Sequence, residues 1–296
     1  MTVLLIRNRS TYFICGFIRS FTKSSKSKAN LFDVRVKQIQ RDNAFGLSNR
    51  KTFDYIREST AINLADRLYD INKEFYLGLE IGCTRGDLLS SKIDSEKINF
   101  LFQSDSSVGA LSRPNSTFPI QMHLESPQLR VSMFDIAIAN LSLHWVNDLE
   151  DCFHRISKLL VPDAPFMISM FGEFTLCELS SSLREAEMKI MGGFSPRVSP
   201  FIRLSDLATL FNAGGFTLIT VDQDYITVRY PGLLELMHDL GRMGESNCTV
   251  GRNTHLRRDV IRLAEEIYMK RYGEEHRNIP ATFEIIYGIG WTPANM

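Results

Sequence analysis

Short apolar segments alternate with helical patterns through most of this chain of 296 residues, and this alternation limits its fold more than any other feature. The segment at residues 134–139 (FDIAIA) is strongly apolar, as in a strand buried on both faces. Alternating strands and helices form a mostly parallel sheet with helices on both of its faces. The predicted strands are 76–81, 98–103, 118–124, 134–139, 165–171, 216–230 and 283–289.

The predicted helices place apolar residues three and four positions apart. They comprise two helices within 32–70, one after the glycines of 82–86, and others at 149–160, 176–190, 205–213, 233–240 and 260–268. No short crossover joins the last two strands, which predicts an antiparallel pair at the sheet edge. We therefore divide the chain into N-terminal helices (31–75) and an α/β domain (76–296), with an ordered loop at 191–203 and a helical lid or docking insertion at 231–280.

The first thirty residues differ in composition from the rest of the chain. They contain six basic residues and no acidic one, since Asp33 is the first, and they are rich in serine. This composition is typical of a mitochondrial transit peptide. A secretory signal fits less well, because arginines interrupt the apolar stretch, and a disordered tail is the remaining alternative.

The overall composition excludes several classes of protein. Lys+Arg and Asp+Glu both number 34, so the chain lacks the cationic excess of a protein that coats nucleic acid. The five cysteines are scattered without a C-x-x-C pair, which predicts neither a zinc site nor a disulfide framework. No apolar run reaches the ~18 residues of a membrane-spanning helix.

The segment at residues 79–86 (LEIGCTRG) joins a strand to the turn after it. Ligands of open α/β sheets bind beyond the carboxyl ends of strands, and small residues there let the backbone approach them. Asp105 ends the next strand, where a carboxylate can accept both hydroxyls of a ribose. Asp105 as a helix N-cap is the structural alternative. A nicotinamide site would favour a fuller G-x-G-x-x-G.

This pair of segments resembles the first two motifs of class I S-adenosylmethionine-dependent methyltransferases, which have a Rossmann-like sheet. Glu80, Gly82, Gly86 and Asp105 match the pattern, whereas Thr84 stands where it expects glycine. The resemblance implies S-adenosylmethionine as cofactor, with Thr84 narrowing the conformations open to the turn.

Three more residues are cofactor-binding candidates by their position. Cys83 lies within the glycine turn, Glu125 follows the third strand near the expected place of the adenine amino group, and Asn140 follows the fourth strand. We expect all three beside the same crevice, because parallel strands end at one edge of a sheet.

Further segments resemble the mitochondrial complex I assembly factor 5 family. They are 140–149 (NLSLHWVNDL), 192–196 (GGFSP), 199–201, 230–232, 235–237, 243–248 (MGESNC), 280–282 and 289–291. The resemblance covers most of the chain beyond residue 31. It implies a matrix protein, peripheral on the matrix face of the inner membrane, that works with other assembly factors of complex I (NADH:ubiquinone oxidoreductase). It also implies hydroxylation of an arginine in the PSST iron–sulfur subunit.

Three residues are candidates for the chemistry. His144 could accept a proton or bind a metal, Trp145 could stack on a guanidinium, and Glu245 could pair with a substrate arginine. The structural alternatives are a hydrogen-bonded structural role for His144, packing for Trp145 and a solvated surface for Glu245. The spacing of the six histidines predicts no iron site of two histidines and a carboxylate, so no metal ligand and no oxygen-activating cofactor is assigned.

Three functions remain open at this point. The first is a protein arginine hydroxylase with an S-adenosylmethionine-type pocket. The second is an ordinary methyltransferase, since methyl transfer needs mostly proximity and orientation. The third is a non-catalytic assembly chaperone that keeps the fold.

Overall fold

The computed structural model describes residues 30–47, 50–84, 89–111, 118–125, 127, 129–274 and 278–294. It also describes the backbone of two antiparallel N-terminal strands, β1 (Leu5–Asn8) and β2 (Thr11–Ile14). Apart from these two strands and residue 30, the predicted transit peptide at 1–30 lies outside the described residues, and so does Gly86.

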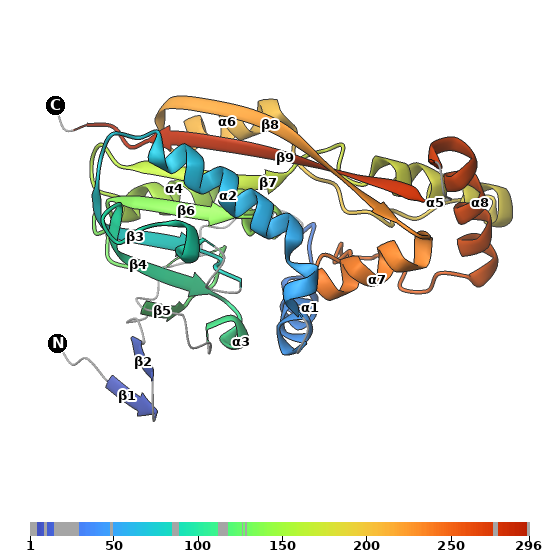
Figure 1. Ribbon diagram of the computed structural model, residues 1–296, viewed down its shortest axis with the longest axis horizontal. Helices are drawn as coiled ribbons and strands as arrows, with labels where there is room; N and C mark the ends of the chain where they lie inside the picture. Colours follow the sequence, from blue (N-terminus) through green and yellow to red (C-terminus); the bar gives the residue numbers. More distant parts are fainter. Residues whose placement is uncertain are drawn as a thin grey trace.

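The main sheet has seven strands among the described residues, in the order β5-β4-β3-β6-β7-β9-β8 (Figure 1). Neighbouring strands are parallel from β5 to β7, whereas β9 is antiparallel to both β7 and β8. This confirms the predicted mostly parallel sheet with an antiparallel edge. The strands are β3 (Phe75–Ile81), β4 (Ile98–Asp105), β5 (Phe118–Gln121), β6 (Ile136–Asn140), β7 (Pro165–Phe171), β8 (Thr217–Tyr230) and β9 (Ile279–Trp291).

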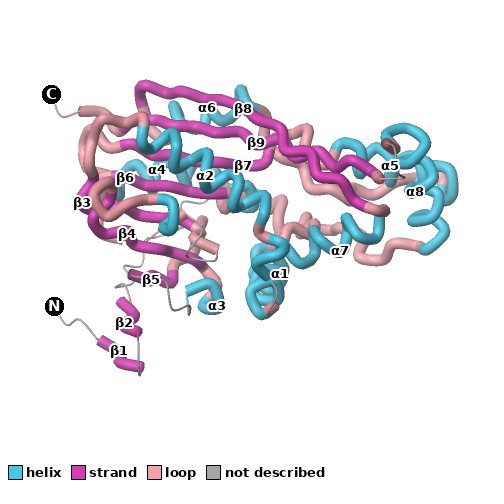
Figure 2. The backbone as a smooth tube through the Cα atoms, viewed as in Figure 1, coloured by secondary structure: helices cyan, strands magenta, loops and turns pink. Residues whose placement is uncertain are grey.

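Helices cover both faces of this sheet, as predicted (Figure 2). The helices of the described residues are α1 (Val34–Gly46), α2 (Tyr55–Tyr69), α3 (Val108–Leu111), α4 (Leu149–Leu159), α5 (Cys177–Met191), α6 (Leu204–Ala213), α7 (Leu233–Met243) and α8 (Arg258–Tyr272). Single 3-10 turns occur at η1 (Arg50–Phe53), η2 (Ser90–Lys92) and η3 (Leu143–Trp145).

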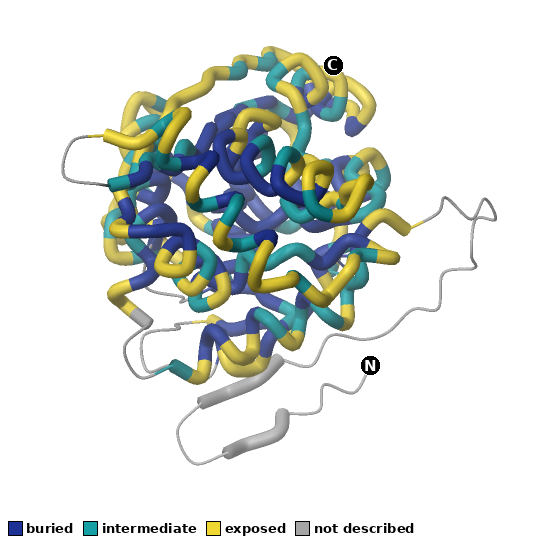
Figure 3. The backbone as a smooth tube through the Cα atoms, turned by 90° about the vertical axis from the view of Figure 1, so that its right-hand side faces the viewer, coloured by how far each residue is buried: buried dark blue, intermediate teal, exposed yellow. Residues whose placement is uncertain are grey.

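Strand β6 shows how the sequence separates the two faces, because successive side chains of a strand point to opposite sides. Ile136 and Ile138 belong to the core formed with α2, α5, α7 and α8. Ala137 and Ala139 belong to the core formed with α4 and α6. All four are almost fully buried, and buried residues fill the centre of the molecule (Figure 3).

The helix expected after the glycine turn is absent from the described part of that segment. Residues 89–97 contain only the short turn η2, so this prediction was wrong for them. The segment carries Ser90, Ser91, Asp94 and Ser95, whose side chains compete for backbone hydrogen bonds and favour turns. Strand lengths differ as well: β5 ends at Gln121 instead of 124.

The insertion between the last two strands consists of α7 and α8, at the far end of the long β8–β9 ribbon (Figure 1). Helix α8 lies beside α5, where the Tyr272 and Ser181 hydroxyl oxygens are 3.0 Å apart. The end of α7 lies beside α1, since Lys37 Nζ donates to the carbonyl of Gly244 at 3.0 Å. The insertion therefore contacts the N-terminal helices, of which α1 lies beyond the carboxyl ends of the strands and α2 crosses one face of the sheet (Figure 1).

Candidate functional site

The carboxyl ends of β3 and β6 meet where the strand order reverses, the usual place for a ligand in such a sheet. Gly82 follows β3 with a φ of 71°, in the left-handed region. A Cβ at this position would lie 2.3 Å from the Cβ of Ser142. Glycine is therefore required here by both the backbone conformation and the close approach of the two strand ends.

Asp105 ends β4 and is fully buried. Its Oδ1 accepts a hydrogen bond from the backbone N–H of Ser107 at 2.9 Å. Its Oδ2 accepts one from Thr84 N at 3.2 Å and an ion-paired one from Arg41 Nη2 at 2.8 Å. The carboxylate predicted to hold a ribose is thus engaged by a guanidinium of helix α1.

Glu80 and Thr84 lie on either side of the glycine. Glu80 is buried in β3, and its Oε2 accepts a hydrogen bond from Gln103 Nε2 at 2.9 Å. Thr84 is buried with a φ of 52°. This left-handed conformation is the one glycine adopts at no steric cost, which explains why the methyltransferase pattern has glycine there.

Of the other three cofactor-binding candidates, Cys83 is a buried free thiol, and Glu125 and Asn140 have side-chain partners within the protein. Burial raises the pKa of the Cys83 thiol well above its usual value. Glu125 Oε1 accepts hydrogen bonds from the backbone N–H and the side-chain amide of Asn147, at 2.9 and 2.7 Å. Asn140 Oδ1 accepts from Thr60 Oγ1 at 2.7 Å and from Ser169 Oγ at 2.8 Å, which joins β6 to α2 and β7.

A small hollow is lined by Arg41, which pairs with Asp105, and by Ser106, whereas Glu80 and Asp105 do not line it. Its volume is about 40 Å³, and it borders Glu125 and Ser142. Four residues of α1 line it: Val34, Lys37, Gln38 and Arg41. Sites for drug-sized ligands measure roughly 300–1,000 Å³. The polar residues match an adenosyl site, but the space does not admit S-adenosylmethionine while α1 is in this position.

A second buried carboxylate, Glu245, lies in the loop after α7. It forms an ion pair with Arg57 Nη2, while its Oε2 accepts from Trp145 Nε1 at 2.7 Å and lies 3.2 Å from His144 Nε2. Burial opposes ionisation of this carboxyl, but Arg57, His144 and Lys37 together hold its pKa far below the usual range. Burial lowers the pKa of His144, so its imidazole is neutral near pH 7.

The structure therefore brings together the three residues proposed for chemistry, although Glu245 lies about 100 positions from the other two. Lys37 completes the cluster, with its Nζ 3.4 Å from the centroid of the Trp145 ring. Desolvation lowers the pKa of Lys37 to about 8. The Trp145 face and the Glu245 carboxylate, both proposed for a substrate guanidinium, are engaged here by Lys37 and Arg57 of this chain.

Sequence reasoning missed Lys37, Arg41 and Arg57. A signal was present for the first two, because residues four positions apart lie on one face of a helix. Nothing in the sequence showed that this face turns inward. Among the described residues, no group of three or more His, Cys, Asp and Glu side chains could hold a metal ion.

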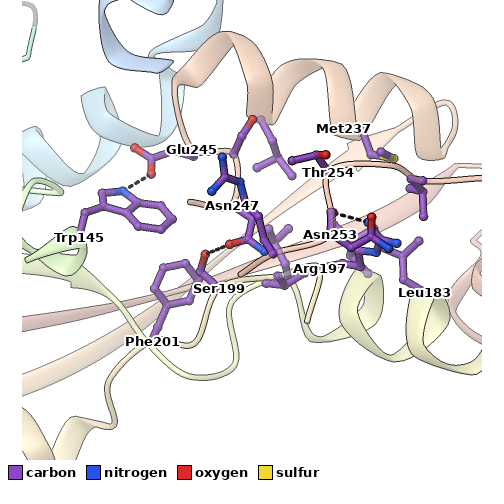
Figure 4. A pocket seen from close by; sticks show the side chains of 17 residues that line it. Trp145, Leu183, Arg197, Ser199, Phe201, Met237, Glu245, Asn247, Asn253 and Thr254 are labelled. Atoms are coloured by element: carbon purple, nitrogen blue, oxygen red, sulfur yellow. Dashed lines mark hydrogen bonds between the residues drawn. The ribbon is translucent and has the colours of Figure 1, made fainter. Parts of the chain in front are cut away.

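A larger cavity of about 320 Å³ adjoins Trp145 and Glu245, between α5, α7 and two loops (Figure 4). Its walls are largely apolar and include Leu179, Leu183 and Met237. The polar side chains that line it are Arg197, Ser199, Glu245, Ser246, Asn247, Arg252, Asn253 and Thr254. Ser199 Oγ donates to Asn247 Oδ1 at 3.0 Å, which ties the two loops together. The cavity is large enough for an amino-acid side chain.

Comparison with known proteins identifies the family. A methyltransferase domain model matches residues 79–168. The mitochondrial arginine-hydroxylase NDUFAF5 of Danio rerio is 40% identical over 279 residues, 93% of this chain and 86% of that protein. The chain belongs to the arginine-hydroxylase NDUFAF5 family. The Homo sapiens NDUFAF5 protein is also 40% identical, over 90% of this chain and 79% of its own length.

The NDUFAF5 family assignment confirms the predicted resemblance to complex I assembly factor 5. A solved structure supports the fold class independently: a putative methyltransferase from Bacillus halodurans superposes with a TM-score of 0.53. The match covers 78% of this chain and 99% of that one at 11% identity, so it bears on the fold alone. Within the described part of the chain, no helix is both long and apolar enough to cross a membrane.

Proposed function

We propose that this chain is a mitochondrial protein arginine hydroxylase that acts in complex I assembly. The observation that carries the proposal is the 40% identity, over 93% of the chain, to a mitochondrial protein named as an arginine-hydroxylase. We further propose that its target is an arginine of the PSST subunit, and that it works with other assembly factors on the matrix face of the inner membrane.

The 320 Å³ cavity is the proposed place for the substrate arginine. Its apolar walls suit the methylene groups of the side chain, and Glu245 stands at one end to receive the guanidinium. Glu245 is ionised in its buried setting, as such a pair requires. The guanidinium of the substrate would compete with that of Arg57 for the Glu245 carboxylate. The affinity for the substrate arginine would therefore depend on the difference in free energy between these two ion pairs.

The residues around Glu245 then orient the substrate. Trp145 Nε1 donates to Oε2 of Glu245, and His144 Nε2 lies within hydrogen-bond distance of the same oxygen, so the two side chains restrict the orientation of the carboxylate. Hydroxylation inserts one oxygen atom of dioxygen into a C–H bond, while the other leaves as water with two electrons and two protons from an external reductant. The role proposed for Glu245, His144 and Trp145 is to hold the arginine side chain in one position for that oxidant.

The test is mass spectrometry of PSST from cells that lack this chain. We expect re-expression of the wild-type chain to restore complex I and the addition of one oxygen atom to a PSST arginine. Leu183→Trp, which fills the cavity, should abolish the modification, whereas Leu234→Trp on the exposed face of α7 should not. Restored assembly with unmodified PSST would refute the hydroxylase.

A methyltransferase is the second candidate, favoured by the domain match at 79–168 and by the sheet order. It predicts transfer of a labelled methyl group from S-adenosylmethionine to a protein or small molecule, and loss of this transfer in Asp105→Ala. Absence of labelled product from mitochondrial extract with the wild-type chain would count against it.

A non-catalytic chaperone is the third candidate, favoured by the small hollow and by the Arg41–Asp105 ion pair. It predicts that Asp105→Ala leaves complex I assembly intact, whereas substitutions within residues 231–247 abolish it. A modified PSST arginine that depends on the wild-type cavity would exclude this role as the whole function.

A further inference from the structure

Helix α1 stands where a cofactor would have to enter. Lys37 and Arg41 of this helix line the 40 Å³ hollow, and Arg41 also pairs with Asp105 at the end of β4. Both side chains are buried, with Lys37 5% and Arg41 6% exposed. Two buried cations therefore lie in the wall of the hollow, beside the apolar side chains of Val34, Leu124 and Val146.

Arg41 makes the contact that most directly opposes a cofactor. Its Nη2 is 2.8 Å from Asp105 Oδ2, and the side chains are 7% and 0% exposed. A ribose bound by Asp105 would need the same carboxylate oxygens, so the two contacts exclude each other. The Nε of Arg41 is buried and has no hydrogen-bond partner among the described residues. This unpaired donor raises the free energy of the closed position and makes its release less costly.

Lys37 links the same helix to the larger cavity. Its Nζ donates to the carbonyls of Gly244 and Ser246, at 3.0 and 2.9 Å, in the loop that also carries Glu245. Ser246 and Glu245 line the 320 Å³ cavity. Arg41 and Lys37 are about one helical turn apart, so a rigid-body movement of α1 away from Asp105 would also carry Lys37 away from this loop.

We propose that α1 is an intramolecular latch: Arg41 competes with the cofactor for Asp105, and cofactor binding displaces α1 and releases Lys37 from the wall of the substrate cavity. The inference rests on the proposal that the hollow takes S-adenosylmethionine. It adds that the chain binds this cofactor with an affinity reduced by the stability of the closed helix, and that cofactor binding changes the substrate cavity.

The first experiment is calorimetric titration of the purified chain with S-adenosylmethionine. Arg41→Met removes the competing guanidinium and keeps the apolar stem, so we expect the cofactor to bind about tenfold more tightly or better than to the wild type, as the binding-competent fraction rises. Arg35→Met, on the exposed side of the same helix, is the matched control and should bind like the wild type.

The second experiment follows Trp145 in a chain that keeps Arg41. The chain has two tryptophans, so Trp291→Phe leaves Trp145 as the single reporter. Lys37 lies over its ring, and S-adenosylmethionine should change its fluorescence as that cation leaves. The same titration in Lys37→Met/Trp291→Phe should give a much smaller change. The Trp145 fluorescence tests the latch even if Arg41→Met does not fold, because this chain keeps Arg41.

The outcomes separate the latch from the cofactor site. Tighter binding by Arg41→Met, or a Trp145 signal that depends on Lys37, supports the latch. Equal or weaker binding by a folded Arg41→Met, with measurable binding by the wild type and no Trp145 signal, overturns the latch and leaves the cofactor site standing. Failure of wild type and Arg41→Met alike to bind overturns the cofactor site, and the latch with it.

Discussion

Replacing Glu245 by glutamine tests whether the buried charge cluster stabilises the fold. The carboxylate is 7% exposed and contacts Arg57, His144 and Trp145, with Lys37 nearby. Glutamine keeps the shape but removes the charge, and its amide NH₂ must face at least one of these donors. Breaking a buried ion pair in this way costs about 3–5 kcal/mol of unfolding free energy. For a chain of this size each kcal/mol lowers Tm by about 2–4 °C.

The assay is urea unfolding followed by circular dichroism, with Asp259→Asn as control. Asp259 pairs with Arg257 on the surface, where both side chains are about half exposed, so its variant should unfold at the wild-type midpoint.

The depressed pKa of Glu245 also predicts how the stability difference between wild type and Glu245→Gln changes with pH. A depressed folded-state pKa stabilises the protein above the unfolded value of 4.5, and this contribution declines as pH falls below that value. The difference between wild type and Glu245→Gln should therefore be largest at neutral pH and shrink in acid. A Glu245→Gln chain as stable as the wild type at pH 7 would show that the cluster contributes no net stability.

Three further substitutions test the charge cluster, the glycine turn and the core. Lys37 has a folded-state pKa of about 8 and an unfolded value of 10.5, so between these pH values the unfolded chain binds more protons and the free energy of unfolding rises with pH. Lys37→Met should lack this rise in urea unfolding measured across that pH range, and an unchanged rise would contradict the assignment. Gly82→Ala forces a Cβ against Ser142 at positive φ and should cost roughly 2–4 kcal/mol, whereas Gly193→Ala has open space and should unfold like the wild type in the same assay. Phe153→Ala, fully buried beneath the sheet, should cost about 3–5 kcal/mol by urea unfolding, and a loss below about 1 kcal/mol would show that the core refills the space.

Most of the fold could be predicted because its signals are local. The run at 134–139 is apolar on both faces, and a strand with that pattern has to be central in a sheet covered on both sides. The antiparallel edge followed from the missing crossover before β9. The prediction of a helix after the glycine turn was wrong for residues 89–97. The alternation of strands and helices suggested it, whereas the serine-rich sequence there favours turns.

Only part of the candidate site could be predicted from the sequence. Glu80, Gly82 and Asp105 could be placed because each lies at or just after the end of a predicted strand, and parallel strands end together. The cationic partners of Asp105 and Glu245 could not be predicted, because Arg41 lies 64 positions from Asp105 and Arg57 lies 188 positions from Glu245. In the sequence they are ordinary basic residues of amphipathic helices, which most often face water.

The sequence by itself determined the order of strands and helices, the glycine at the end of β3 and the two carboxylates that face the strand ends, since these depend on local periodicity and backbone sterics. Only the tertiary structure decided which cations meet Asp105 and Glu245. The reason is that pairing of buried charges depends on how α1 and α2 pack across the sheet, and that packing is settled by contacts between residues far apart in the chain.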